Sequence, residues 1–370
     1  MTQIFSPSQM IGDRYQIHSF VNEGGMQQVY KTLDTRLDRV VALKTPLNES
    51  AEKRFTASAC LSAKVNHPHV AKTLDLFSYG DRQILIEEFV PGLNLKELYD
   101  RDFIYMDPYL VGYLFHRLAK GLAASHHVGV FHRDLKPSNI IVSDEPLPQV
   151  LKITDFGIAK MAEEKFEIIP TAIREEKTVT LEASKTIKGA FPYMAPELLQ
   201  NQNPGLAADV WSVGAIAYEL LCGKKPFGEG TSGLVKVVTG QKPEVPPLEK
   251  INAQFQGLHD ELWRLILRCF EFEPSDRITA DELVGACGEL CYSCAPRKKG
   301  TVAKLRINNW KIGILEGDDD ETTFFHYDSF YGQPSIGTRV LYAEFTGVPH
   351  NRAHPILAIK EESDKELIPF

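Results

Sequence analysis

The residues most able to do chemistry lie in the segment 132–139, which reads His-Arg-Asp-Leu-Lys-Pro-Ser-Asn. Asp134 is an acid that can accept a proton from a hydroxyl group, and Asn139 and the later Asp155 offer oxygen atoms that can hold a metal ion. Phosphoryl transfer requires an aligned hydroxyl, a neutralised triphosphate and a fixed geometry, with little covalent chemistry from the protein. The residue types and their order therefore indicate a phosphoryl-transfer site, against the alternative of a charged surface turn.

The elements that must position these residues change in character along the chain. Residues 15–45 alternate apolar and polar side chains, which predicts successive antiparallel strands with a turn at 23–25. Residues 50–65 favour a helix and residues 84–90 a strand. Apolar residues at helical spacing then predict helices within 95–128, 209–221 and 259–270. A strand-rich part followed by a helix-rich part predicts an α+β fold.

The C-terminal part is expected to form a unit of its own. Residues 291–299 combine Pro with a run of like charges and predict a linker. Strand-like segments follow, at 305, 312–315, 323–327, 339–345 and 356–359, which suggests a small barrel over residues 300–370. The expected domains are an N-terminal extension over 1–13, the α+β unit over 14–290, the linker and the barrel.

Bulk properties exclude several classes of protein. Of the 370 residues, 43% are hydrophobic and 24% are charged, as in soluble globular proteins. The net charge of −8 argues against non-specific clamping of nucleic acid by the whole molecule. No apolar run approaches the ~20 residues needed to cross a bilayer, and the N-terminus lacks the order of a signal peptide. We therefore expect a cytoplasmic protein.

Six cysteines suit a reducing compartment better than a disulfide framework. Cys287, Cys291 and Cys294 lie close together in the sequence and raise the possibility of a zinc site. A fourth ligand at finger-like spacing is lacking, so we interpret them as thiols at a helix end.

The motifs at 132–139 and at Asp155-Phe156-Gly157 match the signature of Hanks-type Ser/Thr protein kinases residue for residue, and the chain resembles bacterial members of this family over about 14–290. The resemblance implies a two-lobed kinase fold, ATP and Mg²⁺ as cofactors, with Mn²⁺ as an alternative metal, and protein substrates. It implies that Asp134 orients the substrate hydroxyl and that Lys136 steadies the γ-phosphate. Asn139 and Asp155 would hold the metal.

The same resemblance implies the nucleotide site. Lys44, at the end of Val-Ala-Leu-Lys, should contact the α- and β-phosphates, and the hinge backbone at Glu88 and Val90 should bind the adenine edge. The nucleotide loop would consist of Val21, Asn22, Glu23, Gly24, Gly25, Met26, Gln27, Gln28 and Val29. Asn22 and Gln27 replace the outer two glycines of the family pattern, and the bulk of Gln27 could hold the loop away from the phosphates.

A further departure concerns the partner of Lys44. Ser58 falls where the family has a helix glutamate that pairs with this lysine, and a neutral Ser cannot make that ion pair. Glu87 stands just before the hinge, at the gatekeeper position, and we infer that its carboxylate replaces the missing one. Glu52 is the competing candidate, and a one-residue misalignment would instead turn Glu87 outward.

The family pattern also implies a switch and two structural anchors. Arg133 would pair with a phosphorylated activation loop, which runs from 155 to 197. The candidate phosphosites and the substituted docking position are Thr178, Thr180, Ser184, Thr186 and Ala190. Glu197 should form a buried ion pair with Arg277, and Asp209 should accept hydrogen bonds from the backbone near His132.

The C-terminal segment resembles a cold-shock domain, an OB-type barrel that stacks single-stranded bases on aromatic side chains. Phe324, His326 and Tyr327 match the third-strand set. The second-strand aromatic positions hold Ile312 and Ile314, and the first-strand Trp position holds Lys304, so half of the stacking platform is missing. The acidic run at 318–321 would repel phosphate. We favour a contact with a protein partner over binding of single-stranded nucleic acid.

The leading hypothesis is an ATP- and Mg²⁺-dependent Ser/Thr protein kinase, regulated by autophosphorylation of its activation loop. The alternatives are a nucleotide-binding pseudokinase scaffold, which the four departures at 22, 27, 58 and 190 favour, and a nucleic-acid-sensing protein that acts through the barrel.

Overall fold

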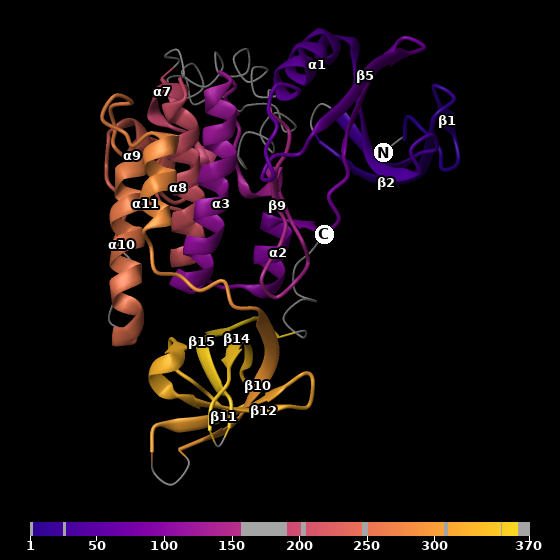
Figure 1. Cartoon of the computed structure of the whole chain (residues 1–370). Coiled ribbons are helices and arrows are strands. Elements are labelled where there is room, and N and C mark those ends of the chain that lie inside the picture. The colour runs from indigo at the N-terminus through magenta and orange to yellow at the C-terminus, as the bar shows by residue number, and fades with distance from the viewer. Residues whose placement is uncertain are drawn as a thin grey trace.

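The structure is a computed structural model that describes residues 3–24, 27–156, 191–200, 205–245, 251–306, 310–348 and 350–361, with the backbone alone over 49–54. It shows a two-lobed kinase fold followed by a closed β-barrel (Figure 1). The N-lobe is a six-stranded antiparallel sheet in the order β1-β2-β3-β4-β6-β5. Its strands are β1 (Met10–Ile11), β2 (Tyr15–Glu23), β3 (Gln27–Asp34), β4 (Arg39–Pro46), β5 (Thr73–Tyr79) and β6 (Arg82–Glu88).

The N-lobe core follows from the alternation in these strands. Side chains such as Tyr30, Leu43 and Ile86 lie on one face and are fully buried. On the other face, α1 (Glu49–Ser62) packs with Phe55 against Leu85 of β6. The two faces of the sheet thus separate an apolar core from the side that faces the helix.

The N-terminal segment is part of this lobe, which differs from the extension expected over residues 1–13. Strand β1 pairs with β2, and Phe5 is 4% exposed within the N-lobe core. The backbone of Phe5 also donates a hydrogen bond to the hydroxyl of Tyr30. The apolar residues of this short segment are buried because the edge of the sheet offers both backbone partners and a hydrophobic surface.

The C-lobe is mainly helical. Its helices are α2 (Leu95–Asp102), α3 (Pro108–His127), α7 (Pro196–Leu199), α8 (Ala207–Cys222), α9 (Gly230–Val238), α10 (Ala253–Cys269) and α11 (Ala280–Gly288), with short 3-10 turns at Pro137–Asn139 and Phe191–Tyr193. The helical pattern over 95–128 divides into two helices because Asp107 caps α3, accepting hydrogen bonds from the amides of Tyr109 and Leu110. Pro108 then occupies the first helical position, which proline favours. Within the described ranges, no helix combines the length and the apolar character required to cross a bilayer.

A small sheet carries the segments of chemical interest. It consists of β7 (Leu93–Asn94), β8 (Ile140–Val142) and β9 (Leu151–Ile153), in that order. Strand β8 directly follows the 132–139 segment, and β9 directly precedes Asp155. Because β8 and β9 are antiparallel neighbours, with Ile140 opposite Ile153, the two segments meet at one end of the sheet.

The C-terminal barrel is built from β10 (Arg297–Leu305), β11 (Ile312–Gly317), β12 (Thr322–His326), β13 (Phe330–Tyr331), β14 (Arg339–Phe345) and β15 (Arg352–Ala358), with a 3-10 turn at Tyr327–Ser329. Strands β12, β11, β10, β14 and β15 pair in succession, and a parallel contact between β12 and β15 closes the circuit. This confirms the expected small all-β barrel at the C-terminal end of the chain.

The barrel begins earlier than expected, because β10 starts at Arg297, inside the stretch expected to be a linker. The like charges there do not resist strand formation, since each is paired. Lys298 lies within 2.8 Å of carboxylate oxygens of Asp319, Glu321 and Glu344.

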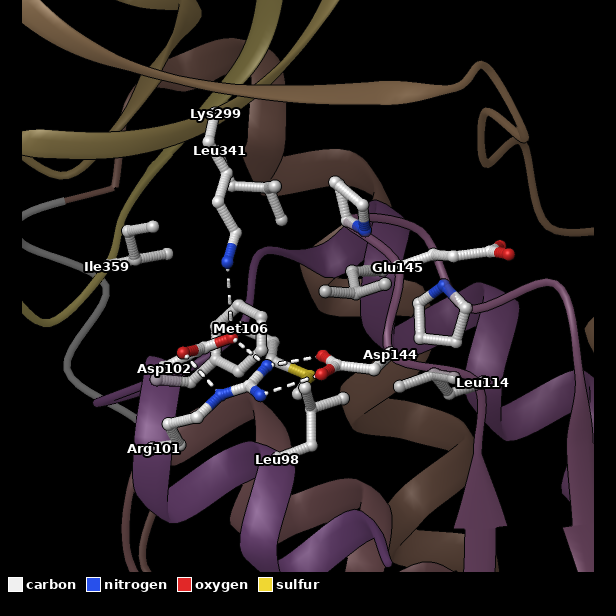
Figure 2. Close-up of a pocket in the computed structure, with 14 residues that line it drawn as sticks. Leu98, Arg101, Asp102, Met106, Leu114, Asp144, Glu145, Lys299, Leu341 and Ile359 are labelled. Carbon is white, nitrogen blue, oxygen red and sulfur yellow. Dashed lines mark hydrogen bonds and ion pairs between the residues drawn. The ribbon is translucent and has the colours of Figure 1, made fainter. Parts of the chain in front are cut away.

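The barrel packs against the end of the C-lobe away from the N-lobe (Figure 1). Tyr331, Leu341 and Leu357 of the barrel belong to the same buried apolar cluster as the C-lobe helices. Figure 2 shows a narrow gap at this junction, where Lys299 faces Asp102. The gap holds about 30 Å³, room for one or two water molecules, so the two units are closely packed here.

Candidate active site

The segment 132–139 is anchored to α8 through the side chain of Asp209. The buried carboxylate of Asp209 accepts hydrogen bonds from the backbone amides of His132, at 2.7 Å, and Arg133, at 2.6 Å. Arg133 has a φ of +65°, a left-handed conformation that is unfavourable for a side chain of this size. The two hydrogen bonds stabilise this conformation, and they confirm the anchor expected at Asp209.

The three polar side chains of this segment contact one another. Lys136 Nζ lies 2.8 Å from Oδ2 of Asp134, and Asn139 Nδ2 donates to the backbone carbonyl of Asp134 at 2.9 Å. Asn139 lies in the 3-10 turn that leads into β8, which fixes its distance from Asp134. An acid, a cation and an amide are therefore brought together on one rigid turn.

Asp155 approaches from the end of β9. Its φ of +62° turns the chain sharply after the strand, and its Oδ1 accepts hydrogen bonds from Lys44 Nζ, at 2.7 Å, and from Gln27 Nε2, at 2.9 Å. Lys44 comes from β4 and Gln27 from β3, so this carboxylate joins the C-lobe to the N-lobe sheet. The contact with Gln27 was not expected from the sequence.

The second partner of Lys44 is Glu87, whose Oε2 lies 2.5 Å from Lys44 Nζ. Register explains the contact: in the β4–β6 pair, Lys44 lies opposite Leu85 and Ala42 opposite Glu87. Residues two apart on a strand share a face, so Lys44 and Glu87 are diagonal neighbours on one face of the sheet. This confirms the expected ion pair and excludes the misalignment that would turn Glu87 outward. The side chain of the competitor, Glu52, lies outside the described residues.

Burial and charge have opposing effects on the pKa values of Lys44, Glu87 and Asp155. Lys44 is 5% exposed and Glu87 also 5%. Burial raises the pKa of Glu87 above its ordinary value, although Lys44 opposes the shift. Burial also favours the neutral form of Asp155, but the charge of Lys44 outweighs it and the pKa of Asp155 lies below its ordinary value. Burial would lower the pKa of Lys44, and the two carboxylates raise it. One cation thus serves two acids, of which Glu87 is buried and Asp155 is partly exposed.

Ser58 makes a contact of a different kind from the glutamate that it replaces. Its hydroxyl donates a hydrogen bond of 2.9 Å to the backbone carbonyl of Phe156. The ring of Phe156 in turn packs 4.9 Å from that of His132. Helix α1 is therefore tied to the Asp155-Phe156 segment by a neutral hydrogen bond, while the ion pair of Lys44 is made within the sheet.

The segment expected to bind adenine lies at the end of β6. The Glu88 amide bonds to the carbonyl of Lys72 at 2.8 Å, and its side chain pairs with Lys152 at 2.7 Å. Val90 follows just beyond the strand. The side chain of Glu88 is thus engaged on the C-lobe side, and a role for the hinge backbone in binding adenine stays a prediction.

The nucleotide loop is only partly described, since Gly25 and Met26 lie outside the described residues. The amide of Gly24 donates to the carbonyl of Gln27 at 2.9 Å, which closes the loop on itself. Gln28 is buried, and its side chain contacts Glu23 and the backbone of Ile4. Its side chain therefore supports the N-terminal segment, and we expect no contact between this side chain and a nucleotide.

The expected switch can be assessed only in part. The phosphosites Thr178, Thr180, Ser184 and Thr186, and the docking position Ala190, lie outside the described residues. The guanidinium of Arg133 lies over the ring of Phe131 at 4.5 Å. Beyond the loop, the expected anchor is confirmed: Arg277 pairs with Glu197 at 2.7 Å, and both are buried.

The donor atoms near Asp134 suit a hard cation. Asn139 and Asp155 supply amide and carboxylate oxygens. Hard cations such as Mg²⁺ and Mn²⁺ prefer oxygen ligands, whereas softer metals prefer nitrogen and sulfur. In the part of the chain that the structure describes, there is no group of three or more His, Cys, Asp or Glu side chains arranged to hold a metal ion.

Cys287 is buried while Cys291 and Cys294 are exposed, and all three are free thiols. Cys287 lies near the end of α11 (Ala280–Gly288), and Cys291 and Cys294 follow beyond the helix.

The stacking positions of the barrel are occupied in an unexpected way. Phe324 is covered by His350, with ring centroids 4.4 Å apart and planes 8° from parallel. The Tyr327 hydroxyl accepts a hydrogen bond from the amide of Arg306, whereas His326 is exposed. Ile312 pairs with His326 and Ile314 with Phe324 across β11 and β12.

The acidic run is less repulsive than expected. Asp318 pairs with Arg339 at 2.7 Å, and Asp319 and Glu321 both pair with Lys298 at 2.8 Å. Neighbouring strands supply the cations, which the sequence spacing did not reveal. The run is therefore partly neutralised within the barrel.

Comparison with known proteins places this geometry in a family. The model of the protein kinase domain matches residues 15–286. The chain is 34% identical, over 94% of its length, to the probable serine/threonine-protein kinase pknA2 of Bifidobacterium longum (strain NCC 2705), and covers 42% of that protein. It is 31% identical, over 76% of its length, to the serine/threonine-protein kinase PkaB of Streptomyces coelicolor, of which it covers 64%.

The fold has a counterpart among solved structures. The chain superimposes on the crystal structure of the PknI kinase domain of Mycobacterium tuberculosis with a TM-score of 0.55 and 19% identity, covering 78% of this chain and 99% of that one. This likeness concerns the fold alone. The match of the domain model to most of the chain shows that this protein belongs to the protein kinase family.

Proposed function

We propose that the chain is an ATP- and Mg²⁺-dependent Ser/Thr protein kinase that transfers the γ-phosphoryl group of ATP to protein hydroxyls. The observation that carries the proposal is the convergence of two sets of residues from different lobes. Asp134, Lys136 and Asn139 lie on one rigid turn, and Lys44 reaches from the N-lobe to Asp155 at 2.7 Å. Phosphoryl transfer depends mainly on such positioning and on compensation of charge.

Each residue has a role that its contacts support. Asp134 would orient the acceptor hydroxyl, and Lys136, held 2.8 Å from it, would stabilise the charge on the phosphoryl group in transfer. Asn139 and Asp155 would hold the metal, which neutralises the triphosphate when bound. Lys44 would contact the α- and β-phosphates, with Glu87 keeping its ammonium group in place.

Regulation by phosphorylation of the activation loop belongs to the same proposal. Arg133 directly precedes Asp134, and a phosphate near its guanidinium would form charge-assisted hydrogen bonds that order the loop. The curated relatives that the chain matches are longer, and it spans 37 to 66% of their lengths. Substrates and partners of the complete protein are therefore part of the proposal.

The competing function is a nucleotide-binding scaffold without transferase activity. The observations that favour it are the side chain of Gln27 in the nucleotide site and the hydrogen bond that replaces an ion pair at Ser58. The contacts that Asp134 makes with Lys136 and that Asp155 makes with Lys44 speak against it, since these residues are the ones proposed to contact the metal and the phosphates.

Incorporation of labelled phosphate distinguishes the two functions. We expect the wild-type chain, given ATP with Mg²⁺ or Mn²⁺, to phosphorylate itself or a general protein acceptor. Asp134→Asn should reduce the rate by at least about 10²-fold, the scale of a lost general base. Asp155→Asn should reduce the rate by a similar factor and should also weaken the dependence of the rate on the metal. Absence of incorporation by the wild type, with ATP still bound, would establish the scaffold instead.

For the barrel, we propose a contact with a protein partner rather than with single-stranded nucleic acid. Support comes from the ring of His350, which covers Phe324, and from the isoleucines at the second-strand positions, since aromatic stacking supplies about 1–3 kcal/mol per base. The full chain should therefore show no salt-sensitive binding of a labelled single-stranded oligonucleotide.

A further inference from the structure

The side chain of Gln27 lies inside the nucleotide site, where the family pattern has a glycine. Gln27 is the first residue of β3 and is 6% exposed. Its Nε2 donates to Oδ1 of Asp155 at 2.9 Å, and the same oxygen accepts a hydrogen bond from Lys44 at 2.7 Å. Gln27 thus ties the loop to Asp155, the group that would contact the metal and that also pairs with Lys44.

The other end of this amide is not satisfied. Its Oε1 is buried and has no hydrogen-bond donor among the residues that the structure describes. A buried amide carbonyl without a donor is unfavourable, because the group has lost its hydrogen bonds to water and gained none in return. The side chain would recover those bonds if it moved out to solvent. The observed contact with Asp155 is therefore made at a cost to the other end of the amide.

A glycine at this position lets the backbone of the loop approach a phosphate without a Cβ in the way. Here a side chain of four further heavy atoms beyond Cβ runs from the loop to Asp155 instead. The loop backbone is closed on itself as well, through the hydrogen bond between the Gly24 amide and the Gln27 carbonyl. Space and hydrogen-bonding groups on the phosphate side of the cleft are thus taken up by the protein itself.

We propose that Gln27 is a positioning residue that competes with the metal of the bound nucleotide for the carboxylate of Asp155. Its amide holds Asp155 in place, and the side chain must leave the cleft before a triphosphate and its metal can enter. This inference rests on the proposed function, because it requires a nucleotide in this cleft. It makes the affinity for the phosphate part of the nucleotide lower than the contacts of Lys44 and the metal alone would give, while the adenosine part is unaffected.

The variant Gln27→Gly restores the glycine and removes the competitor. Binding of ATP and of adenosine to the full chain is measured by calorimetry, with and without Mg²⁺. We expect ATP to bind about tenfold more tightly, the order of one charge-assisted hydrogen bond, with adenosine unchanged. Gln241→Gly is the matched control: it makes the same replacement at an exposed position outside the nucleotide loop, and both affinities should stay within about twofold of the wild type.

Equal or weaker binding of ATP by Gln27→Gly would overturn the inference, because the glutamine would then be neutral or a ligand. An equal gain for adenosine would also overturn it, since that result indicates general opening of the cleft. If Gln27→Gly does not fold, Gln27→Ala serves, as it removes the same amide with less backbone freedom. A wild type that binds neither ligand refutes the proposed function, whereas binding of both without the selective gain refutes this inference alone.

Discussion

At the scale of single residues, the nucleotide site obtains its carboxylate from a strand instead of a helix. Lys44 and Glu87 lie on one face of the same sheet, so the ion pair is set by the register of β4 and β6. A pair within a sheet does not depend on where a neighbouring helix stands. Helix α1 keeps a contact with the site through Ser58, and this contact is a neutral hydrogen bond to the backbone. We infer that movement of α1 would alter the Asp155-Phe156 segment and leave Lys44 paired.

Replacement of Glu87 tests this arrangement directly. In Glu87→Ala, Lys44 keeps Asp155 as its partner and is drawn toward it, away from the phosphates. We expect the Kd for ATP to rise about tenfold or more, as for the loss of one charged partner of a hydrogen bond. The measurement is ATP binding by calorimetry, with the thermal unfolding midpoint of each variant recorded as a check on folding.

The control uses the family's own solution. Ser58→Glu in the Glu87→Ala background returns a carboxylate from α1 and should recover part of the lost affinity. Ser58→Ala, which removes only the hydrogen bond to Phe156, should change the affinity much less. Unaltered ATP binding by Glu87→Ala would show that the pair has no part in holding the nucleotide.

The residues of the site differ in how far the sequence could predict them. The grouping of Asp134, Asn139, Asp155 and Lys44 was predictable because their types and spacing match one chemistry. The ion pair to Glu87 was predictable once a neutral Ser58 left a buried lysine without its usual partner. The contact between Gln27 and Asp155 was not, because it depends on the path of a flexible side chain between two lobes.

At the scale of elements, the N-lobe sheet is fastened at one end by a buried carboxylate. Asp34 closes β3 with its side chain fully buried, and Arg14 holds it through two hydrogen bonds of 2.8 and 2.7 Å. The position matters because β3 begins with Gln27 and β2 ends with the first residues of the nucleotide loop. The Arg14–Asp34 pair thus fixes the β2–β3 hairpin at the end opposite the nucleotide loop.

Acidification should weaken the N-lobe through this carboxylate. The hydrogen bonds from Arg14 hold the pKa of Asp34 below its ordinary value, and burial opposes them. A carboxyl group whose pKa is lower in the folded state stabilises the fold above the pKa of the unfolded chain, and this contribution is lost as pH falls through the folded-state value. Asp34→Asn should therefore be less stable than the wild type at pH 7, with the difference shrinking in acid.

The free energy of unfolding is measured by urea denaturation between pH 7 and pH 3. Asp75→Asn is the comparison, because Asp75 lies 3.6 Å from the same arginine but its side chain is 39% exposed. A solvated pair is worth little, so we expect a small and nearly constant difference for that variant. A constant difference for Asp34→Asn as well would show that its carboxyl group is not linked to folding.

Elements themselves were predicted well where the pattern is long, and less well at their ends. The buried helix α8, most of α10 and the strands β2, β3, β4 and β6 lie where periodicity places them, whereas β1 and β5 were not predicted. The break at Asp107 was missed because the helical spacing of apolar residues continues across it. The early start of β10 was missed because the neutralisation of Lys298 comes from the β11–β12 turn and from β14, which lie more than twenty residues away in the sequence.

At the scale of the whole molecule, the barrel and the kinase C-lobe share one hydrophobic core. Tyr331 packs between Tyr105, at a ring-centroid distance of 5.6 Å, and Phe255, at 5.2 Å. Asn252, at the start of α10, donates to the backbone carbonyls of Tyr327 and Phe330 in the barrel. The sequence predicted the two units but not their union, because neither periodicity nor motif reveals which surfaces meet.

The union places a charge where the solvent cannot reach it. Arg297 forms two hydrogen bonds to the carboxylate of Asp107, at 2.5 and 2.9 Å, and both side chains are at least nine-tenths buried. Asp107 also caps α3, so a residue of the barrel neutralises the acid that begins the central helix of the C-lobe. Stability of the kinase domain should accordingly depend on the barrel.

Arg297→Met keeps most of the side-chain volume and leaves Asp107 buried without its cation. Breaking a buried pair in this way costs about 3–5 kcal/mol, so the free energy of unfolding should fall by that order. Lys299→Met is the matched control: its ammonium lies 3.6 Å from Asp102 and is 34% exposed, so the loss should stay near ~0.5 kcal/mol. Adding Asp107→Asn to Arg297→Met should restore much of the stability, because Asn still caps the helix and carries no charge.

Urea unfolding followed by tryptophan fluorescence reports both units, since Trp211 and Trp263 lie in the C-lobe and Trp310 in the barrel. Equal losses for Arg297→Met and Lys299→Met would mean that the buried pair does not couple the barrel to the kinase, and that the apolar contacts around Tyr331 alone hold the two together.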